Sequence, residues 1–243
     1  NNMIIHSEDG FNQNYYDSTP TSIIIALFTI TLFVVDDFTK YIVHRWMHKI
    51  PLLWAIHKVH HSAKTMTPIT VYRVHPVESI IYGLRGSIVI GAVIGIFAYC
   101  FGIDNFSLAT LLGVNLFSFI FNIAGANLRH SHIEIAYWPW LEKIFISPAQ
   151  HQLHHSIENK HFNKNYGAML AIWDWLFGSL HFSETGKSIR FGLRPNEASI
   201  PPDVLLRYDG RLEATFVLVQ LWSILPTGSY HLPPESDDPE CLA

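Results

Sequence analysis

Two long apolar runs in the middle of this 243-residue chain limit what it can fold into. Residues 86–103 and 106–126 carry no charged side chain, and only Asp104 and Asn105 separate them. Each run is close to the roughly 20 residues that a helix needs to cross the hydrocarbon core of a bilayer. Because lipid admits only backbone that is hydrogen-bonded internally, the pair predicts a transmembrane helical hairpin.

The remaining sequence also favours a membrane protein. The chain is 49% hydrophobic and only 15% charged, which is more apolar than a typical soluble domain. Residues 21–35 form another apolar stretch, and we expect this helix to continue through Asp36 towards His48. The net charge of -4 provides no basic surface for nucleic acid, so nucleic acid is not an expected partner.

A hairpin leaves and returns on one side of the membrane, so the sequences before and after it share that side. Lysine and arginine gather there and are absent from the tip between the two runs; the basic residues on that side include Arg45, Lys49, Lys58, Lys64, Arg73, Arg129 and Lys143. By the positive-inside rule, this side is predicted to be cytoplasmic.

Histidine is the unusual residue of this sequence, with 15 copies that are clustered. One HxxxH motif and two HxxHH motifs flank the apolar runs, joined by a shorter HxH pair; these histidines are His44, His48, His57, His60, His61, His130, His132, His151, His154 and His155. Helical residues three and four apart lie on neighbouring faces, so each motif can aim several imidazoles at one point. The spacing predicts metal ligation.

The number of imidazoles predicts two ions, because eight or more exceed what one ion accepts. Zinc, copper, iron and nickel all suit imidazole, and two cysteines alone cannot build a thiolate site. His130 and His132 cannot both point inward from a regular helix. A lone HxxxH motif is also compatible with interfacial histidines that bind only backbone or headgroups.

Three further residues are candidates for supporting the ligands. Asp37 and Tyr41 share a helical stripe with His44 and His48, and metal-bound imidazoles usually donate their second N–H to a carboxylate or carbonyl. Asp37 or Asp174 could accept such a bond, although either could equally serve solubility or capping. His75 precedes Pro76, with Glu78 in the following turn, and is interpreted as marking a helix start.

At the level of whole motifs, the sequence resembles the sterol desaturase and fatty acid hydroxylase superfamily. The resemblance lies in the HxxxH motif after Asp37, the first HxxHH motif with Arg73-Val-His75-Pro76 behind it, and the second HxxHH motif followed by Asn165-Tyr-Gly167 and Trp173-Asp-Trp-Leu-Phe-Gly178. It covers about residues 36–181. It implies the ligand and catalytic set His44, His48, His57, His60, His61, His130, His151, His154 and His155.

The resemblance also implies an all-α integral membrane bundle with a cytoplasmic, histidine-rich di-metal cap. Residues 21–181 would form the fatty acid hydroxylase-like domain. By composition, residues 1–20 are expected to be a polar leader, and 182–243 a C-terminal segment whose apolar part could be an interfacial helix and whose proline-rich end a disordered tail. The implied cofactors are two iron ions, which zinc can replace in a purified sample, with O2 as co-substrate.

The activity so implied is hydroxylation or desaturation of a C–H bond in a membrane lipid. The sequence has no Gly-rich dinucleotide motif and no CxxCH haem motif, so electrons are expected from a separate cytochrome-type or ferredoxin-type protein. Two alternatives stay open. A scaffold that binds structural zinc would keep the same motifs, whereas a metal transporter should place ionisable ligands within residues 86–126, which have none apart from Asp104.

Overall fold

The computed structural model describes residues 19–102, 125, 128–195 and 197. They belong to one compact unit that covers Asn1–Ser199. The described part is helical, and its β-structure is limited to two isolated bridges, Phe145 with Leu170 and Ser156 with Phe191. The expected all-α class is therefore confirmed for this part of the chain.

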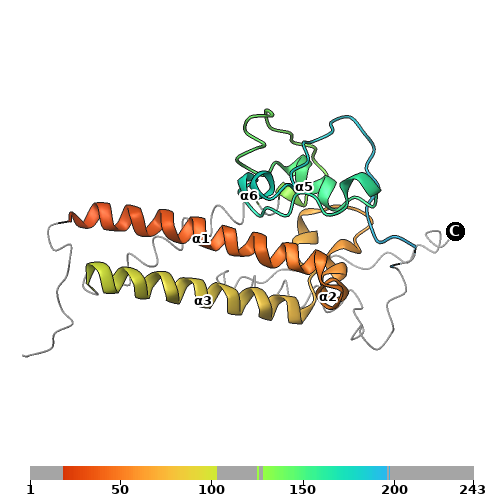
Figure 1. The fold of residues 1–243 in the computed structure, drawn as a ribbon. Coiled ribbons are helices and arrows are strands. Elements are labelled where there is room, and N and C mark those ends of the chain that lie inside the picture. The colour runs from red at the N-terminus through yellow and green to blue at the C-terminus, as the bar shows by residue number, and fades with distance from the viewer. Residues whose placement is uncertain (1–18, 103–124, 126–127, 196, 198–243) are drawn as a thin grey trace, which may run out of the picture. The chain divides into compact units, whose positions relative to one another are not determined.

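Two long helices, α1 (Thr21–Lys49) and α3 (Pro76–Phe101), run antiparallel against each other (Figure 1). Ile24, Phe28 and Leu32 of α1 form a buried apolar cluster with Val89, Val93 and Phe97 of α3. The Phe28 and Phe97 rings meet edge to face with 5.4 Å between centroids. Further along the pair, Arg85 donates to Asp36 at 2.8 Å. The predicted continuation of the first helix past Asp36 to His48 is confirmed.

The outer surfaces of α1 and α3 are apolar. Both helices are long and apolar enough to cross a membrane, and only 22% and 17% of the residues in their most apolar windows are buried within the structure. A core helix of a soluble protein would be mostly buried, so these surfaces suit lipid. α3 contains most of the first apolar run, whereas residues 103–124 of the expected hairpin, the leader 1–18 and the tail 198–243 lie outside the described residues.

The turn between α1 and α2 (Pro51–His61) aims the first histidine motifs at each other. Ile50 is extended, with φ −97° and ψ 118°, and Pro51 follows it at the first position of α2. Proline suits that position because its missing N–H would be unpaired there anyway. The sharp break lets the last turn of α1 face α2 across a short distance. A 3-10 helix, η1 (Pro68–Tyr72), then leads to α3.

The second HxxHH motif lies on α5 (Pro148–His154), which a reciprocal capping box starts. The Gln150 N–H donates to Ser147 Oγ at 3.1 Å, and the Ser147 N–H donates to Gln150 Oε1 at 2.9 Å. The chain continues through η3 (Asn159–His161) to α6 (Ile172–Leu176), which lies against α1 (Figure 1). Every residue of α5 is buried, so this short helix is held by its surroundings.

Candidate metal centre

Nine of the ten predicted histidines gather into two adjoining groups. In each group the ring nitrogens that face inward lie within 4.8 Å of one another. The first histidine group is His44, His48, His57, His61 and His154, and the second histidine group is His60, His130, His151 and His155. The groups touch, because the His61 and His155 rings stack with 4.3 Å between centroids.

Each HxxHH motif contributes to both groups, in complementary proportions. On α2, His57 and His61 are four residues apart and join the first group, while His60 points into the second. The motif around α5 reverses this pattern, since His151 and His155 join the second group and His154 the first. Residues four apart share a helix face and the residue between them faces aside, so one motif can serve two ions.

Backbone and carboxylate oxygens fix the orientation of four of these rings. The Nδ1–H groups of three of them are donated to backbone carbonyls: His44 to Tyr166 at 2.7 Å, His60 to Arg73 at 3.2 Å and His154 to Lys164 at 2.8 Å. The fourth, His57, donates to Glu78 Oε1 at 2.8 Å. A neutral ring that donates through Nδ1 keeps only a lone pair on Nε2, and that lone pair is the metal-binding atom.

The distances between the inward ring nitrogens suit nitrogens that bind a shared metal ion better than nitrogens that hydrogen-bond to each other. His44 Nε2 and His57 Nε2 lie 3.1 Å apart although both are acceptors, so this contact needs a cation between the two lone pairs. In the second group the Nε2 separations are 3.1 Å for His60–His130, 3.0 Å for His130–His151 and 3.2 Å for His151–His155. Two nitrogens bound at right angles about 2.1 Å from one ion are about 3.0 Å apart.

Other ring nitrogens of the same groups lack hydrogen-bond partners altogether. Nε2 of His48, His61 and His154 is buried without one. Unmatched buried polar atoms are rare and call for an explanation such as an absent ion. Burial lowers the pKa of His57 and of His60 to about 3, the nearby His57 contributing for His60, so both rings are neutral at physiological pH. The residues present therefore fit two metal ions.

Two buried carboxylates brace the loop that supplies the Tyr166 and Lys164 carbonyls. Asp37 of α1 accepts bonds from the Met169 N–H at 3.0 Å, the Leu170 N–H at 3.1 Å and Trp173 Nε1 at 2.9 Å. Asp174 accepts from the Tyr166 N–H at 2.9 Å and the Gly167 N–H at 2.7 Å. Burial raises the pKa of Asp174 to about 6 despite these donors.

Asn165 and Gly167 adopt conformations that this loop requires. Asn165 has φ 54°, a left-handed conformation that asparagine tolerates, and its side chain bonds the Gln150 carbonyl and both backbone groups of His181. A Cβ on Gly167 would lie 2.6 Å from the Leu170 carbonyl oxygen, so only glycine fits there. These two residues explain the Asn165-Tyr-Gly167 motif in physical terms.

Three remaining sequence candidates lie outside the two histidine groups. His132 is exposed and belongs to neither histidine group. His75 caps α3 by accepting the Val77 N–H at 3.2 Å, which confirms the predicted helix start. Tyr41 is fully buried, lies 3.1 Å from Ser179 Oγ through its hydroxyl, and accepts from Arg45 at 2.7 Å.

Among the described residues, the carboxylate that accepts a hydrogen bond from a ring of the two histidine groups is Glu78. Among the contacts of the described residues, Asp37 and Asp174 bind backbone and side-chain donors and receive no bond from either histidine group. The sequence alone places Glu78 in the first turn of a helix. Its sequence offers no signal for the contact with His57, which η1 creates by folding α3 back against α2.

The fold and the site define a class: a helical membrane protein whose histidines form two adjoining groups suited to metal ions. The chain belongs to the fatty acid hydroxylase family, whose model matches residues 29–179. The resemblance seen in the sequence motifs is thereby confirmed. No solved structure matches the chain significantly.

Three curated relatives illustrate the range of this family. The chain is 28% identical to ornithine lipid hydroxylase OlsE of Rhizobium tropici over 66% of its own length and 44% of that protein. It is 26% identical to human alkylglycerol monooxygenase, over 66% of the chain and 32% of the relative. It is also 26% identical to the Delta(7)-sterol 5(6)-desaturase of Eremothecium gossypii, over 64% and 38%. The chain thus spans less than half the length of each.

Proposed function

We propose that this chain is the catalytic core of an O2-dependent lipid oxidoreductase with two iron ions, one in each histidine group. The observation that carries the proposal is the convergence of inward Nε2 atoms 3.0–3.2 Å apart in both groups, with His44 and His57 facing each other through two lone pairs. The nine ligands are the histidines of the two groups. Zinc can replace iron at such nitrogen sites in a purified sample.

The protein's own contribution is to hold neutral imidazoles in fixed orientations. Four imidazole rings donate their Nδ1–H groups to fixed oxygen atoms: the backbone carbonyls of Tyr166, Lys164 and Arg73 and the carboxylate of Glu78. These hydrogen bonds prevent the rings from rotating, so their Nε2 atoms stay directed at the metal positions. Iron bound here would supply the activation of O2 that a C–H bond requires. Because the rings must be neutral to bind metal, iron retention and activity should decline together at acid pH.

The substrate class is a membrane lipid: a sterol, a fatty acyl chain or a related molecule. The names of the relatives support this, since they cover an ornithine lipid, an alkylglycerol and a sterol. In hydroxylation one oxygen atom enters the C–H bond and the other leaves as water, and in desaturation both leave as water. Both reactions consume two electrons and two protons, which a separate cytochrome-type or ferredoxin-type protein would deliver.

We further propose that the histidine groups face the cytoplasm. Lysine and arginine concentrate at the histidine end of the chain's apolar helices, and the positive-inside rule places such residues on the cytoplasmic side.

A lipid-conversion assay tests the proposed activity. The purified protein, loaded with iron, is given lipid extract, a chemical reductant and isotopically labelled O2, and the lipids are compared by mass spectrometry. We expect a lipid with one labelled oxygen, or lacking two hydrogens, for the wild type and for His132→Ala. The double variant His154→Ala/His155→Ala should lose the product at least about 100-fold, because one ligand leaves each group. Identical lipid profiles for all three proteins would support a scaffold without catalysis.

A further inference from the structure

A third cluster of metal-ligating side chains lies outside the two histidine groups. At its centre is His161, the last residue of η3, whose side chain is only 2% exposed. Both of its ring nitrogens are buried and neither has a hydrogen-bond partner. A buried imidazole with two unmatched nitrogens is unfavourable unless something binds it.

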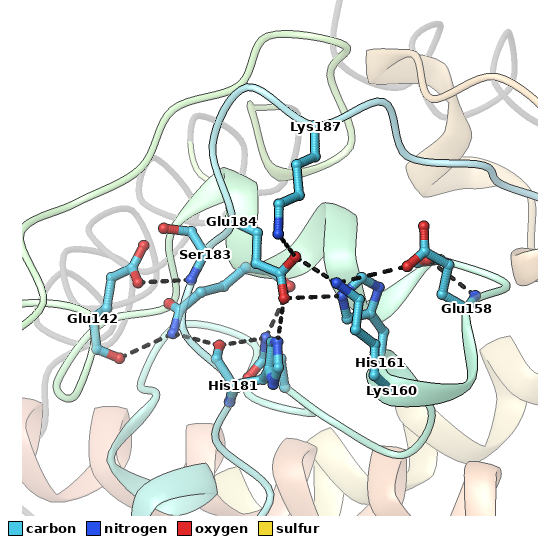
Figure 2. A network of polar contacts seen from close by, with 11 residues as sticks. Glu142, Glu158, Lys160, His161, His181, Ser183, Glu184 and Lys187 are labelled. Atoms are coloured by element: carbon cyan, nitrogen blue, oxygen red, sulfur yellow. Dashed lines mark hydrogen bonds and ion pairs between the residues drawn. The ribbon is translucent and has the colours of Figure 1, made fainter.

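Two other ligand-type side chains face His161, as Figure 2 shows. Glu184 Oε1 lies 3.7 Å from His161 Nε2 and 3.2 Å from His181 Nε2. The His161 and His181 rings are 5.2 Å apart between centroids, and one donor atom of each of the three residues lies within 4.8 Å of the others. Two imidazoles and a carboxylate therefore converge on one point.

The two oxygens of Glu184 have different neighbours. Oε2 is bonded by the ammonium groups of Lys160 and Lys187, whereas Oε1 faces the two imidazoles (Figure 2). Both lysine side chains are well exposed, at 46% and 64%, and both bond Oε2, so Oε1 stays available to an ion between the two imidazoles. The lysines hold the pKa of Glu184 well below its usual range, and burial lowers the pKa of His161, so both groups are in the form that binds metal.

We propose that His161, His181 and Glu184 form a third metal site, suited to a zinc-type divalent ion. Imidazole nitrogens and a carboxylate oxygen are ligands that zinc accepts in tetrahedral sites, and water can take the fourth position. The site is separate from the two histidine groups, since it shares no residue with them.

The position of this site indicates a structural role behind the catalytic centre. The ion would join η3 to the segment that contains His181 and Glu184. Asn165 already links that segment to α5 through the Gln150 carbonyl, and the neighbouring Lys164 carbonyl orients His154. An ion bound at His161 would therefore stabilise the loop whose Lys164 carbonyl orients His154 of the first histidine group.

Zinc titration of the iron-loaded protein in detergent tests the proposal. Zinc bound per chain is measured by elemental analysis against a competing chelator, while iron content is followed in the same samples. We expect the wild type and His132→Ala, a matched variant at an exposed histidine, to bind one zinc ion per chain without releasing iron. His161→Ala should bind zinc at least about 10-fold more weakly and keep its iron.

Glu184→Gln serves as the second variant, because it keeps the side-chain shape if His161→Ala folds poorly. It removes the ligand charge and should weaken zinc binding by a similar factor while iron remains. Zinc binding that is equal in the wild type, His161→Ala and Glu184→Gln would overturn the proposal, as would a wild type that binds no zinc beyond the amount that displaces iron.

Discussion

At the scale of single residues, the metal centre depends on the acceptors that hold its rings. Three of these are backbone carbonyls, which no substitution removes directly. Glu78 is the exception, because a side chain only 4% exposed accepts the His57 Nδ1–H at 2.8 Å. It is therefore the residue at which the effect of a ring-orienting group can be measured without changing a ligand.

Glu78→Ala should weaken iron binding by about 10–100-fold, because it removes the acceptor that keeps His57 in the tautomer with Nε2 free. Glu78→Gln should lose much less, since its amide oxygen can still accept the same hydrogen bond. Iron content after equilibration with a graded series of chelator concentrations gives the affinities. Equal iron retention in Glu78→Ala and the wild type would show that Glu78 does not orient His57.

The same residues show which parts of the site can be predicted from sequence. Helical spacing alone brings His57 and His61 to one face, and it identifies the HxxHH motifs as ligand motifs. Helical spacing does not show which histidine of each motif binds which ion, because that assignment depends on how α2 and α5 face each other in the fold. The choice among buried acids, Glu78 rather than Asp37 or Asp174, also depends on tertiary contacts that link residues far apart in the chain.

At the scale of elements, Asp37 connects α1 to the loop before α6. Its carboxylate satisfies two backbone N–H groups and the Trp173 indole, all from a segment more than 130 residues away in the sequence. A helix residue that only favoured solubility would be exposed, whereas Asp37 is 1% exposed. The bond network, and not local helix propensity, explains an acid in this apolar helix.

Asp37→Ala should destabilise the protein by about 3 kcal/mol, because it leaves buried donors without an acceptor. A loss of that size corresponds to a melting temperature lower by roughly 6–12 °C for a chain of this length. Glu134→Ala, at an exposed acid, is the control and should stay within about 0.5 kcal/mol of the wild type. Thermal unfolding in detergent measures both, and equal melting temperatures would rule out the bracing role.

Helix positions were easier to predict than helix junctions. The apolar stretch before Asp36 and the Pro76 helix start predict two helices, and the structure confirms where each begins. The break at Ile50 was not predicted, although Pro51 directly follows it. Proline is compatible with either a kink or a new helix, and the packing of His48 against Trp54 and His57 favours the second outcome here.

At the scale of the whole molecule, the contacts between the histidine groups constrain the topology. α3 carries the chain about 39 Å away from α2 at 1.5 Å per residue. Yet His130 lies 3.1 Å from His60 of α2, between the Nε2 atoms. Residues 61 and 130 therefore lie at the same end of α3, which is the arrangement that a transmembrane hairpin between them produces.

Cysteine labelling tests both this topology and its orientation. The test uses two variants, Lys64→Cys before the apolar runs and Lys143→Cys after them, both at exposed positions. Each is made in a chain whose Cys100 and Cys241 are replaced by alanine. A membrane-impermeant maleimide should modify both in inside-out vesicles and neither in intact cells, because both positions flank the histidine groups, which we propose face the cytoplasm. Modification of only one position in a given preparation would contradict the hairpin, since the two sides of the chain would then face opposite compartments. Modification of both in intact cells would leave the hairpin and the metal centre in place and reverse only the orientation, which would require electrons to arrive from outside the cell.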